Sequence, residues 1–242
     1  MTKRSCFGAL ALATVGALVA RAHAADIAPI DSMAQRMQAC AACHGREGRA
    51  ASDGYYPRIA GKPALYLYQQ LLNFRDRRRG YAPMTHMVKN LSDDYLREIA
   101  GYFAALDLPY APPQPGPTTP QGLALGGDLV RLGDKARGIP ACVACHGSAL
   151  TGVLPATPGL VGLPRDYINA QLGARKTGLR RASAPDCMAR VVARLGSPDI
   201  AAVSMWLASQ PVPIDSRAIP PPAPGTSAPG LCAGLPSLDG KP

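Results

Sequence analysis

Apolar residues recur every three or four positions in three segments of the first half of the chain, which is the spacing of helices with one buried face. The first helix is expected to begin after Asp31 or Ser32, because short polar side chains cap helix N-termini. Pro63 should start the second helix, which runs to a stop at Gly80, and Ser92 should cap the third. The expected apolar stripes are Met33, Met37, Cys40 and His44 in the first helix, Leu65, Tyr68 and Leu72 in the second, and Leu96, Ile99, Phe103 and Leu106 in the third.

The second half of the chain repeats this order of elements. Pro164 should start its middle helix, and Ser197 and Pro198 are expected to be the cap and first turn of its last helix. No segment alternates convincingly between apolar and polar residues as a half-buried strand does, so the pattern predicts an all-α fold. The apolar residues of the opening helix are Leu125, Leu129 and Leu132.

An internal repeat underlies this similarity. At an offset of 101, Pro57, Gly61, Pro63, Tyr66, Gln70 and Leu71 return as Pro158, Gly162, Pro164, Tyr167, Gln171 and Leu172. At an offset of 104, Met84, Leu91, Ile99, Tyr102 and Phe103 return as Met188, Leu195, Val203, Trp206 and Leu207. Two copies of a long unit indicate a duplicated domain rather than a solenoid of short repeats.

Proline marks the expected boundaries. The stretch from Pro109 to Gln121 holds six prolines, a composition typical of a semi-rigid extended linker. The C-terminal segment is rich in proline, glycine and alanine without a helical period. The expected parts are a first domain, a linker, a second domain and a tail, at residues 26–110, 111–121, 122–211 and 212–242.

The N-terminus has the pattern of a secretory signal peptide. Lys3 and Arg4 precede an apolar run over residues 6–20, and residues 22–24 read Ala-His-Ala, an A-x-A cleavage site. We expect residues 1–24 to be removed after Ala24 and the mature protein to be exported to the periplasm. The alternative is a signal that is retained as an anchor.

The net charge of the chain indicates which class of partner it binds. The chain carries a formal charge of +10, and removal of Lys3, Arg4 and Arg21 leaves +7 (10 − 3) on the mature protein. An exported chain with only 5% aromatic residues is a poor match to a nucleic-acid-binding protein. The basic charge instead favours docking on an acidic protein or an anionic membrane surface.

Two C-x-x-C-H motifs carry the chemistry of the chain. They are Cys40-Ala41-Ala42-Cys43-His44 and Cys142-Val143-Ala144-Cys145-His146, and each has the spacing that attaches a c-type haem. Two thiols one helical turn apart can add to the two vinyl groups of a haem, and the next histidine is then held against the iron. The motifs therefore predict two covalently bound haem c groups. The thioether residues would be Cys40, Cys43, Cys142 and Cys145, and the proximal ligands His44 and His146.

Other uses of these cysteines are a redox dithiol in each motif or one zinc site shared by the four thiolates. Both leave the two histidines that follow the motifs unexplained, along with the methionines far along the chain. Haem attachment accounts for all of these residues.

The duplicated motifs resemble the dihaem cytochrome c4 family of tandem class I c-type domains. The resemblance covers residues 26–210 and rests on the repeated C-x-x-C-H motif, the segment from Met84 to Asp93, and Gly138-Ile139-Pro140-Ala141-Cys142. It implies two helical domains, each wrapped around a covalent haem, with the haem edges facing one another. It does not cover the proline-rich tail, Cys187 or Cys232.

Methionine is the expected sixth iron ligand in both domains. Met84 and Met188 occupy corresponding places in the repeat, each eight residues before the start of a final helix. A thioether opposite imidazole raises the potential of a haem and suits electron transfer. In the first domain Met87 and His86 remain alternative ligands because of their proximity to Met84.

Cys187 departs from the family pattern because it immediately precedes Met188. The favoured prediction is a disulfide with Cys232, since these two cysteines have no other assigned role in an oxidising compartment. The alternatives are free or intermolecular thiols, or ligation of the second iron by the Cys187 thiolate in place of Met188.

A run of arginines is predicted to end the second helix of each domain. One interpretation is a solvated helix end whose positive charges complement the helix dipole. The other is a docking patch for an acidic redox partner. The basic residues are Arg75, Arg77, Arg78 and Arg79 in the first copy and Arg175, Lys176, Arg180 and Arg181 in the second.

Taken together, the residues predict a periplasmic carrier of electrons between redox proteins, for example toward a terminal oxidase, with no substrate of its own. One alternative is a dihaem enzyme such as a thiosulfate dehydrogenase or a peroxidase. Another is a cytochrome subunit of a periplasmic dehydrogenase complex, or a partner of a membrane oxidase, held there by the proline-rich tail.

Overall fold

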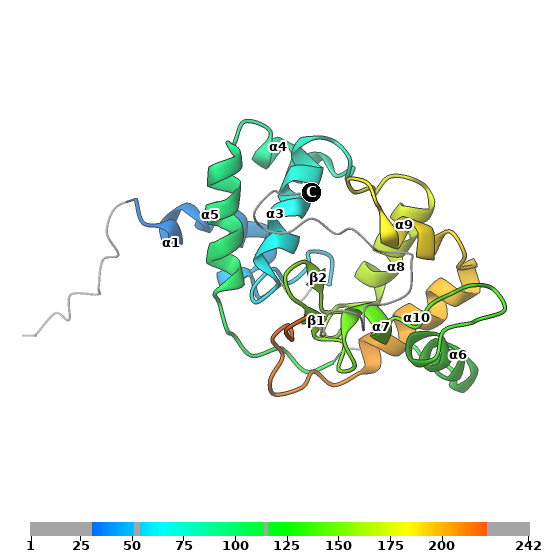
Figure 1. Cartoon of the computed structure of the whole chain (residues 1–242). Helices are drawn as coiled ribbons and strands as arrows, with labels where there is room; N and C mark the ends of the chain where they lie inside the picture. Colours follow the sequence, from blue (N-terminus) through cyan, green and yellow to red (C-terminus); the bar gives the residue numbers. More distant parts are fainter. Residues whose placement is uncertain (1–30, 51–53, 114–115, 222–242) are drawn as a thin grey trace, which may run out of the picture.

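The computed structural model of the chain describes residues 31–50, 54–113 and 116–221. We refer to residues 31–113 as the first half and to residues 116–221 as the second half. The expected signal peptide, Cys232 and most of the proline-rich tail lie outside the described residues. The two halves form two groups of helices that lie side by side (Figure 1). Among the described helices, none is both long and apolar enough to cross a membrane.

The first half is built from short helices around two longer ones. Ser32 caps the opening helix through a reciprocal pair of hydrogen bonds with Gln35, as expected for one of the two candidate caps. The helix then breaks at Met37, so that the predicted single helix is two shorter ones. The elements are α1 (Met33–Arg36), α2 (Gln38–His44), the 3₁₀ turn η1 (Arg46–Gly48), α3 (Ala64–Arg75), α4 (Ala82–Val88) and α5 (Asp93–Ala104).

Helices α3 and α5 form the core of the first half. Ser92 caps α5 with a hydrogen bond from the backbone N–H of Tyr95, as the sequence predicts. Leu96 and Phe103 of α5 are almost completely buried and pack in one cluster with Phe74 of α3. Burying a side chain of this size contributes about 1.5–3 kcal/mol. The apolar stripe of α5 therefore holds α3 in place.

The second half has the same plan with an added pair of short strands. Its elements are α6 (Pro120–Arg131), α7 (Val143–His146), β1 (Gly152–Val153), β2 (Thr157–Pro158), α8 (Arg165–Lys176), α9 (Cys187–Val192) and α10 (Ser197–Ser209). Strands β1 and β2 are antiparallel, with Gly152 opposite Pro158. The fold is nevertheless all-α in class, because these strands have only two residues each.

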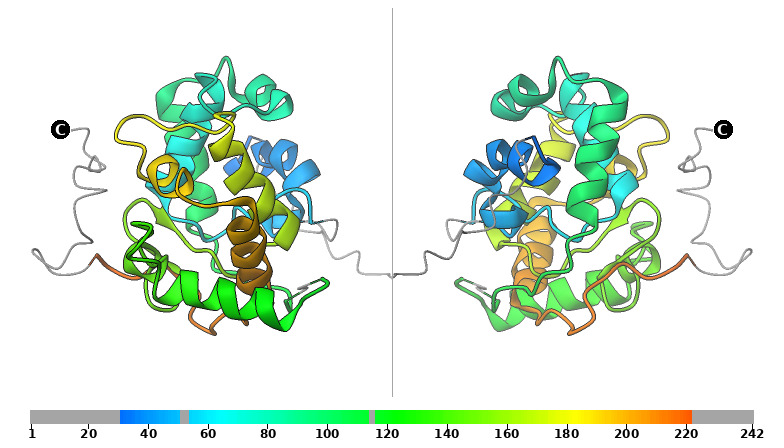
Figure 2. Two further views of the ribbon diagram at one scale, coloured as in Figure 1. Left: turned by 90° about the vertical axis from the view of Figure 1, so that its right-hand side faces the viewer. Right: turned by 90° about the vertical axis from the view of Figure 1, so that its left-hand side faces the viewer.

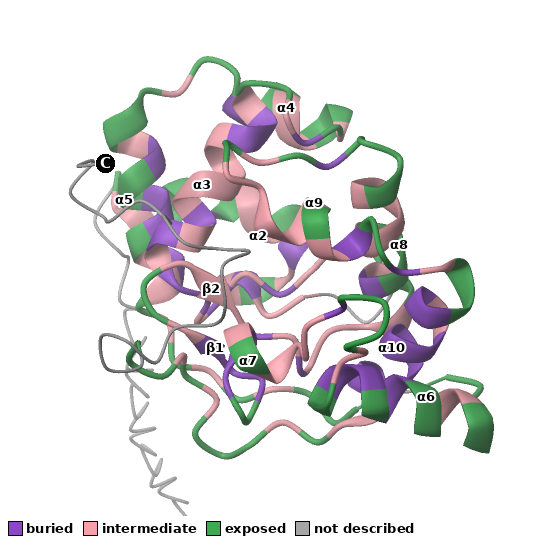
Figure 3. Cartoon of the chain, turned by 45° about the vertical axis from the view of Figure 1, so that its right-hand side comes forward, coloured by how far each residue is buried: buried purple, intermediate pink, exposed green. Residues whose placement is uncertain are grey.

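The crossing of α6 and α10 is the centre of the second half. Figure 2 shows α6 along the base of the molecule with α10 standing on it, and Figure 3 shows that α10 is buried over most of its length. A Cβ atom on Gly126 would lie 2.2 Å from the carbonyl oxygen of Ala202 and 2.7 Å from the Cβ of Trp206. A glycine is required here because the two backbones approach too closely for a side chain.

Three local predictions are wrong. Helix α3 ends at Arg75 rather than at Gly80, because Arg77 adopts a left-handed backbone conformation (φ +58°) and the next residues run extended toward the second half. Helix α10 is capped by Gly196 and not by Ser197, because the Asp199 carboxylate accepts from the backbone N–H of Gly196. The third wrong prediction is the apolar stripe of the opening helix of the second half. Leu129 is buried, but Leu125 and Leu132 are exposed.

The chain beyond α10 returns to the second half as an extended arm, residues 213–221. Ile219 adds to the edge of β1: its N–H donates to Gly152 O (3.0 Å), and its carbonyl accepts from Leu154 N–H (2.8 Å). The Ile219 side chain packs on Gly147, the residue after His146. The arm thereby covers the loop that follows the second C-x-x-C-H motif.

Candidate haem-binding sites

Helices α2 and α7 present the two C-x-x-C-H motifs. In α2 the motif fills the last turn, with Cys40 half-buried and Cys43 exposed. In the second half Cys142 precedes α7 as its N-cap and His146 is its last residue. A helical turn places both thiols of a motif on one side, as double attachment to one haem requires.

Each proximal histidine is held by a backbone carbonyl in the same way. His44 Nδ1 lies 2.9 Å from Pro57 O, and His146 Nδ1 lies 2.7 Å from Pro158 O. Both rings are buried, and this burial is the main cause that lowers the pKa of each. A neutral ring that donates from Nδ1 carries its lone pair on Nε2, which is the tautomer that binds a metal.

Burial disfavours the thiolate form of the first cysteine in each motif. Burial raises the pKa of the Cys142 thiol to about 11, with a smaller contribution from Cys145, and burial likewise raises the pKa of Cys40. A reactive dithiol needs a thiolate at neutral pH, and the raised pKa values of Cys40 and Cys142 do not favour it. Within the described ranges, no group of three or more Cys, His, Asp or Glu side chains converges as a metal site would require. The zinc alternative therefore receives no support.

Met84 lies on the short helix α4, eight residues before Ser92, the cap of α5. The Met84 side chain is half-buried and packs against the core of the first half. The Thr85 hydroxyl donates to Phe74 O (3.1 Å) and fixes α4 against α3. The two alternative ligands point to solvent: His86 is exposed and Met87 is 46% exposed.

Met188 occupies the corresponding place on α9 and packs against the core of the second half. Asp186 caps α9 by accepting from Ala189 N–H (3.0 Å) and from Ala182 N–H (2.7 Å). The same carboxylate accepts from Arg175 at 2.7 Å in a largely buried ion pair. Burial and, to a smaller extent, the positive charge of Arg180 together lower the pKa of Arg175 to about 10.

Cys187 is the first residue of α9 and is half-buried. Its predicted disulfide partner, Cys232, lies outside the described residues, so the bridge stays a prediction.

The two halves meet in a polar layer that obeys the internal repeat. Arg79 donates to Gln70 Oε1 (2.9 Å), to Gln171 Oε1 (2.7 Å) and to the Tyr167 hydroxyl (3.1 Å). Arg180 donates to the same two glutamines at 3.1 and 3.0 Å and to the Tyr66 hydroxyl at 3.2 Å. The pKa of Tyr66 is lowered overall. Burial alone would raise it, but the positive charges of Arg180 and Arg79 together outweigh that effect.

This layer corrects the interpretation of the arginine runs. Arg79 and Arg180 are buried and face one another across an antiparallel bridge, so neither is available as part of a docking patch or as a solvated helix end. Gly80 N–H donates to Leu179 O, and Arg181 N–H donates to Arg78 O, both at 2.7 Å.

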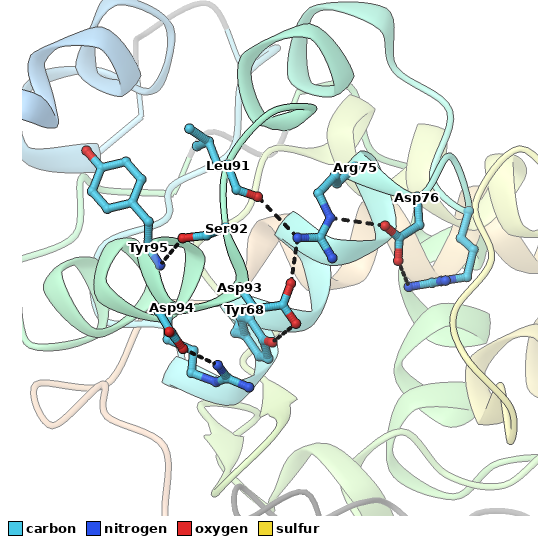
Figure 4. A network of polar contacts seen from close by, with 10 residues as sticks. Tyr68, Arg75, Asp76, Leu91, Ser92, Asp93, Asp94 and Tyr95 are labelled. Atoms are coloured by element: carbon cyan, nitrogen blue, oxygen red, sulfur yellow. Dashed lines mark hydrogen bonds and ion pairs between the residues drawn. The ribbon is translucent and has the colours of Figure 1, made fainter.

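Two further arginines of the first run anchor their own half. Arg75 donates to Asp93, Asp76 and the carbonyl of Leu91, and thereby joins the end of α3 to the start of α5 (Figure 4). Arg78 pairs with Asp76 at 2.7 Å. Arg77 remains exposed, as does Arg181 in the second run.

A second cluster lies at the end of the first half, around Tyr110. The Arg58 guanidinium stacks on the Tyr110 ring at 3.9 Å and donates to the carbonyls of Pro109 and Leu108. Lys62 Nζ donates to the Tyr110 hydroxyl and, across the interface, to Gly159 O, both at 3.4 Å.

The buried cations provide a test of whether the site fits haem. Arg58, Lys62, Arg79 and Arg180 are all at least 92% buried, and every hydrogen-bond acceptor described for their side chains is an uncharged oxygen. The buried Nε of Arg180 has no hydrogen-bond partner in the part of the chain that is described. Buried charges normally have a counter-charge. Haem carries two propionate carboxylates, so two haems fit this excess of positive charge, as the cysteine pairs and oriented imidazoles fit the rest of the group.

Sequence reasoning identified the motif residues but not this interface. The signal was present in part, because Tyr66 and Gln70 recur at the offset of 101 that also relates Arg79 to Arg180. Arg58 and Lys62 had no such signal, since their counterparts in the second half are Gly159 and Leu163.

Comparison with known proteins gives a consistent result. No family profile matches the chain. The thiosulfate dehydrogenase electron acceptor of Thiomonas intermedia (strain K12) is 40% identical over 203 residues, which are 84% of this chain and 91% of that protein. Cytochrome c4 of Pseudomonas aeruginosa is 34% identical over 200 residues, or 81% of this chain and 94% of that protein.

A solved structure agrees. Reduced recombinant cytochrome c4 from Pseudomonas stutzeri superposes with a TM-score of 0.63 at 30% identity, over 72% of this chain and 95% of that one. Two C-x-x-C-H helices with anchored histidines, a duplicated all-α fold and these relatives lead to one conclusion: the chain belongs to the cytochrome c4 family of dihaem, electron-carrying c-type cytochromes.

Proposed function

We propose that this cytochrome works in the periplasm, after cleavage of the signal peptide behind Ala24, and shuttles electrons between a dehydrogenase and a further redox protein. It would consist of two cytochrome c domains, residues 26–110 and 122–211, joined by the linker 111–121. The relative named a thiosulfate dehydrogenase electron acceptor supports a dehydrogenase as the donor. The basic charge of the chain supports docking on an acidic partner surface.

The proposed ligand sets are His44 with Met84 and His146 with Met188. The observation that carries the proposal is the contrast on α4, where Met84 packs into the core while Met87 and His86 are exposed. When bound, each haem takes up and releases one electron at its iron. Met84 and Met188, as the second protein ligands, would close each iron to exogenous ligands, and this suits a carrier rather than an enzyme.

The second candidate is an enzyme that oxidises an inorganic sulfur compound such as thiosulfate. Cys187 favours it, because this half-buried residue directly precedes Met188 at the start of α9. A thiolate in place of the thioether would lower the potential of the second site.

Two measurements on the purified protein separate these functions. The carrier predicts two haems per chain that survive acid-acetone extraction, rapid electron exchange with small mediators, and negligible steady-state turnover of thiosulfate or peroxide. The enzyme predicts turnover together with a low-spin thiolate signal in electron paramagnetic resonance that disappears in Cys187→Ser. Freely extracted haem would refute both.

A further inference from the structure

Lys62 breaks the two-fold repeat of the interface between the halves. The Tyr66, Gln70 and Arg79 set is mirrored 101 residues later, whereas the counterpart of Lys62 is the apolar Leu163. Lys62 is 95% buried, and its ammonium group reaches out of the first half to the carbonyl of Gly159 in the second. The repeat therefore gives Lys62 no matching cation that reaches from the second half into the first.

The contact leads to the proximal histidine of the other half. Gly159 follows Pro158, and Pro158 O is the acceptor that orients the His146 ring at 2.7 Å. A Cβ atom on Gly159 would lie 2.6 Å from Thr151 O, so this loop is tightly packed against the rest of the second half. Lys62 thus places its charge beside the segment that holds His146.

The described residues of the first half make no equivalent contact. The residue that follows Pro57, the acceptor of His44, is Arg58, and its guanidinium is used on Tyr110 and on carbonyls at the end of its own half. Arg175 is paired with Asp186, whereas Lys62 donates only to uncharged oxygens among the described residues.

The position of Lys62 is fixed by its surroundings. Its ammonium group also donates to the Tyr110 hydroxyl, and Tyr110 lies beneath the stacked Arg58 guanidinium. On the other side, a Cβ atom on Gly162 would lie 2.4 Å from the Tyr110 ring. Both hydrogen bonds of Lys62 are long at 3.4 Å, so its effect on the second half comes from its charge and less from bond strength.

From this geometry we infer that Lys62 is a positioning residue of the first half that stabilises the reduced form of the second haem, so that an electron on the protein settles on the side of His146. The inference rests on the proposed attachment and ligation of two haems. Reduction adds one negative charge to a site, and a buried cation nearby favours that state because the effective dielectric constant is far below that of water. One such charge is expected to shift the electron distribution between the haems about tenfold, or about 59 mV for one electron.

The test is a redox titration of the holoprotein in which both potentials are resolved. Lys62→Met and Lys62→Gln remove the charge, and Lys62→Gln retains a donor for Gly159 O. Both variants should lower the potential of the second haem and shift the electron distribution about tenfold toward the first haem. Lys62→Arg retains the charge and should keep most of the wild-type difference. The exposed Lys89 supplies the control, since Lys89→Met removes the same net charge away from the interface.

The two potentials are assigned with Met84→His and Met188→His, because each substitution should change the potential of its own haem. An unchanged difference between the potentials in both neutral variants overturns the inference, as does a shift confined to the first haem. If Lys62→Met fails to fold, Lys62→Gln and Lys62→Arg still decide between charge and packing. Failure of the proposed function is distinguished before the titration. The wild-type protein would then hold fewer than two haems per chain, or its spectrum would lack the signature of methionine ligation.

Discussion

Arg79 and Arg180 face each other in an antiparallel bridge, and each donates hydrogen bonds to both Gln70 and Gln171. The two glutamine carbonyls are thus shared by two guanidinium groups from different halves. This arrangement makes the orientation of the halves depend on four side chains that the gene duplication supplies in pairs.

The first prediction concerns this shared network. Arg180→Met should lower the free energy of unfolding of the holoprotein by about 2 kcal/mol, because partly buried acceptors on Gln70, Gln171 and Tyr66 lose a charged donor. Denaturant unfolding followed by haem absorbance measures the change. Arg77→Met, at an exposed position, should change it by less than about 0.5 kcal/mol. Equal losses in the two variants would mean that the network contributes nothing specific.

The second prediction tests the close contact of α6 and α10. Gly126→Ala should destabilise the second half by about 2 kcal/mol or more, because the added Cβ meets the Ala202 carbonyl at 2.2 Å and the helices must separate. Gly173→Ala on α8 is the matched control: nothing lies within 4 Å of its added Cβ, and helix propensity favours alanine by about 1 kcal/mol. Thermal unfolding should therefore shift in opposite directions in the two variants.

Ligation of the first iron gives the third prediction. Met84→Ala should abolish the sulfur-to-iron absorption of the first haem and lower its potential, since a solvent molecule is a harder ligand than a thioether. Met87→Ala should leave both quantities nearly unchanged, because that side chain is half in solvent and outside the core. The opposite pattern in the visible spectra would transfer the ligand role to Met87.

The fourth prediction is a pH dependence centred on Asp199. Hydrogen bonds from Arg137, at 2.7 and 3.2 Å, hold the pKa of this carboxyl below its usual 3.8. The unfolded chain takes up the proton at a higher pH than the folded protein does. The contribution to stability is therefore present above about pH 4 and is lost as the pH falls through the lowered pKa.

Asp199→Asn should consequently be less stable than the wild type at pH 7, with a difference that shrinks below pH 4. Urea unfolding at several pH values measures it. Asp94→Asn is the control, because the Asp94 side chain is 91% exposed and its ion pair with Arg97 is screened by solvent. A constant difference across the pH range would contradict the proposed role of the Arg137 pair.

The helical framework and the attachment residues could be predicted from the sequence because their signals are local. Ser32, Pro63 and Ser92 mark helix starts through the chemistry of the first turn, and each C-x-x-C-H motif is five consecutive residues. The end of α3 could not be predicted, since Arg77 leaves the helix in order to bring Arg79 to a partner 101 positions away.

The role of the buried cations was also beyond sequence reasoning. A run such as Arg77-Arg78-Arg79 has the composition of a solvated surface, and only the packing of the two halves reveals that one of its members is buried. Likewise, the repeat predicted where Met84 lies along the chain. It could not predict that Met84 packs into the core while Met87 is exposed, because this depends on which side of α4 faces the core.

The arm that pairs Ile219 with strand β1 has a consequence for self-association. Strand β1 is short, and its outer edge would otherwise offer the Gly152 carbonyl and the Leu154 N–H to any extended chain that came near. Such open edges promote pairing between molecules. Because the polypeptide fills this edge with its own residues, the surface beside the second haem motif is closed to strand exchange, and a molecule ending at Pro211 would be the form prone to dimerise there.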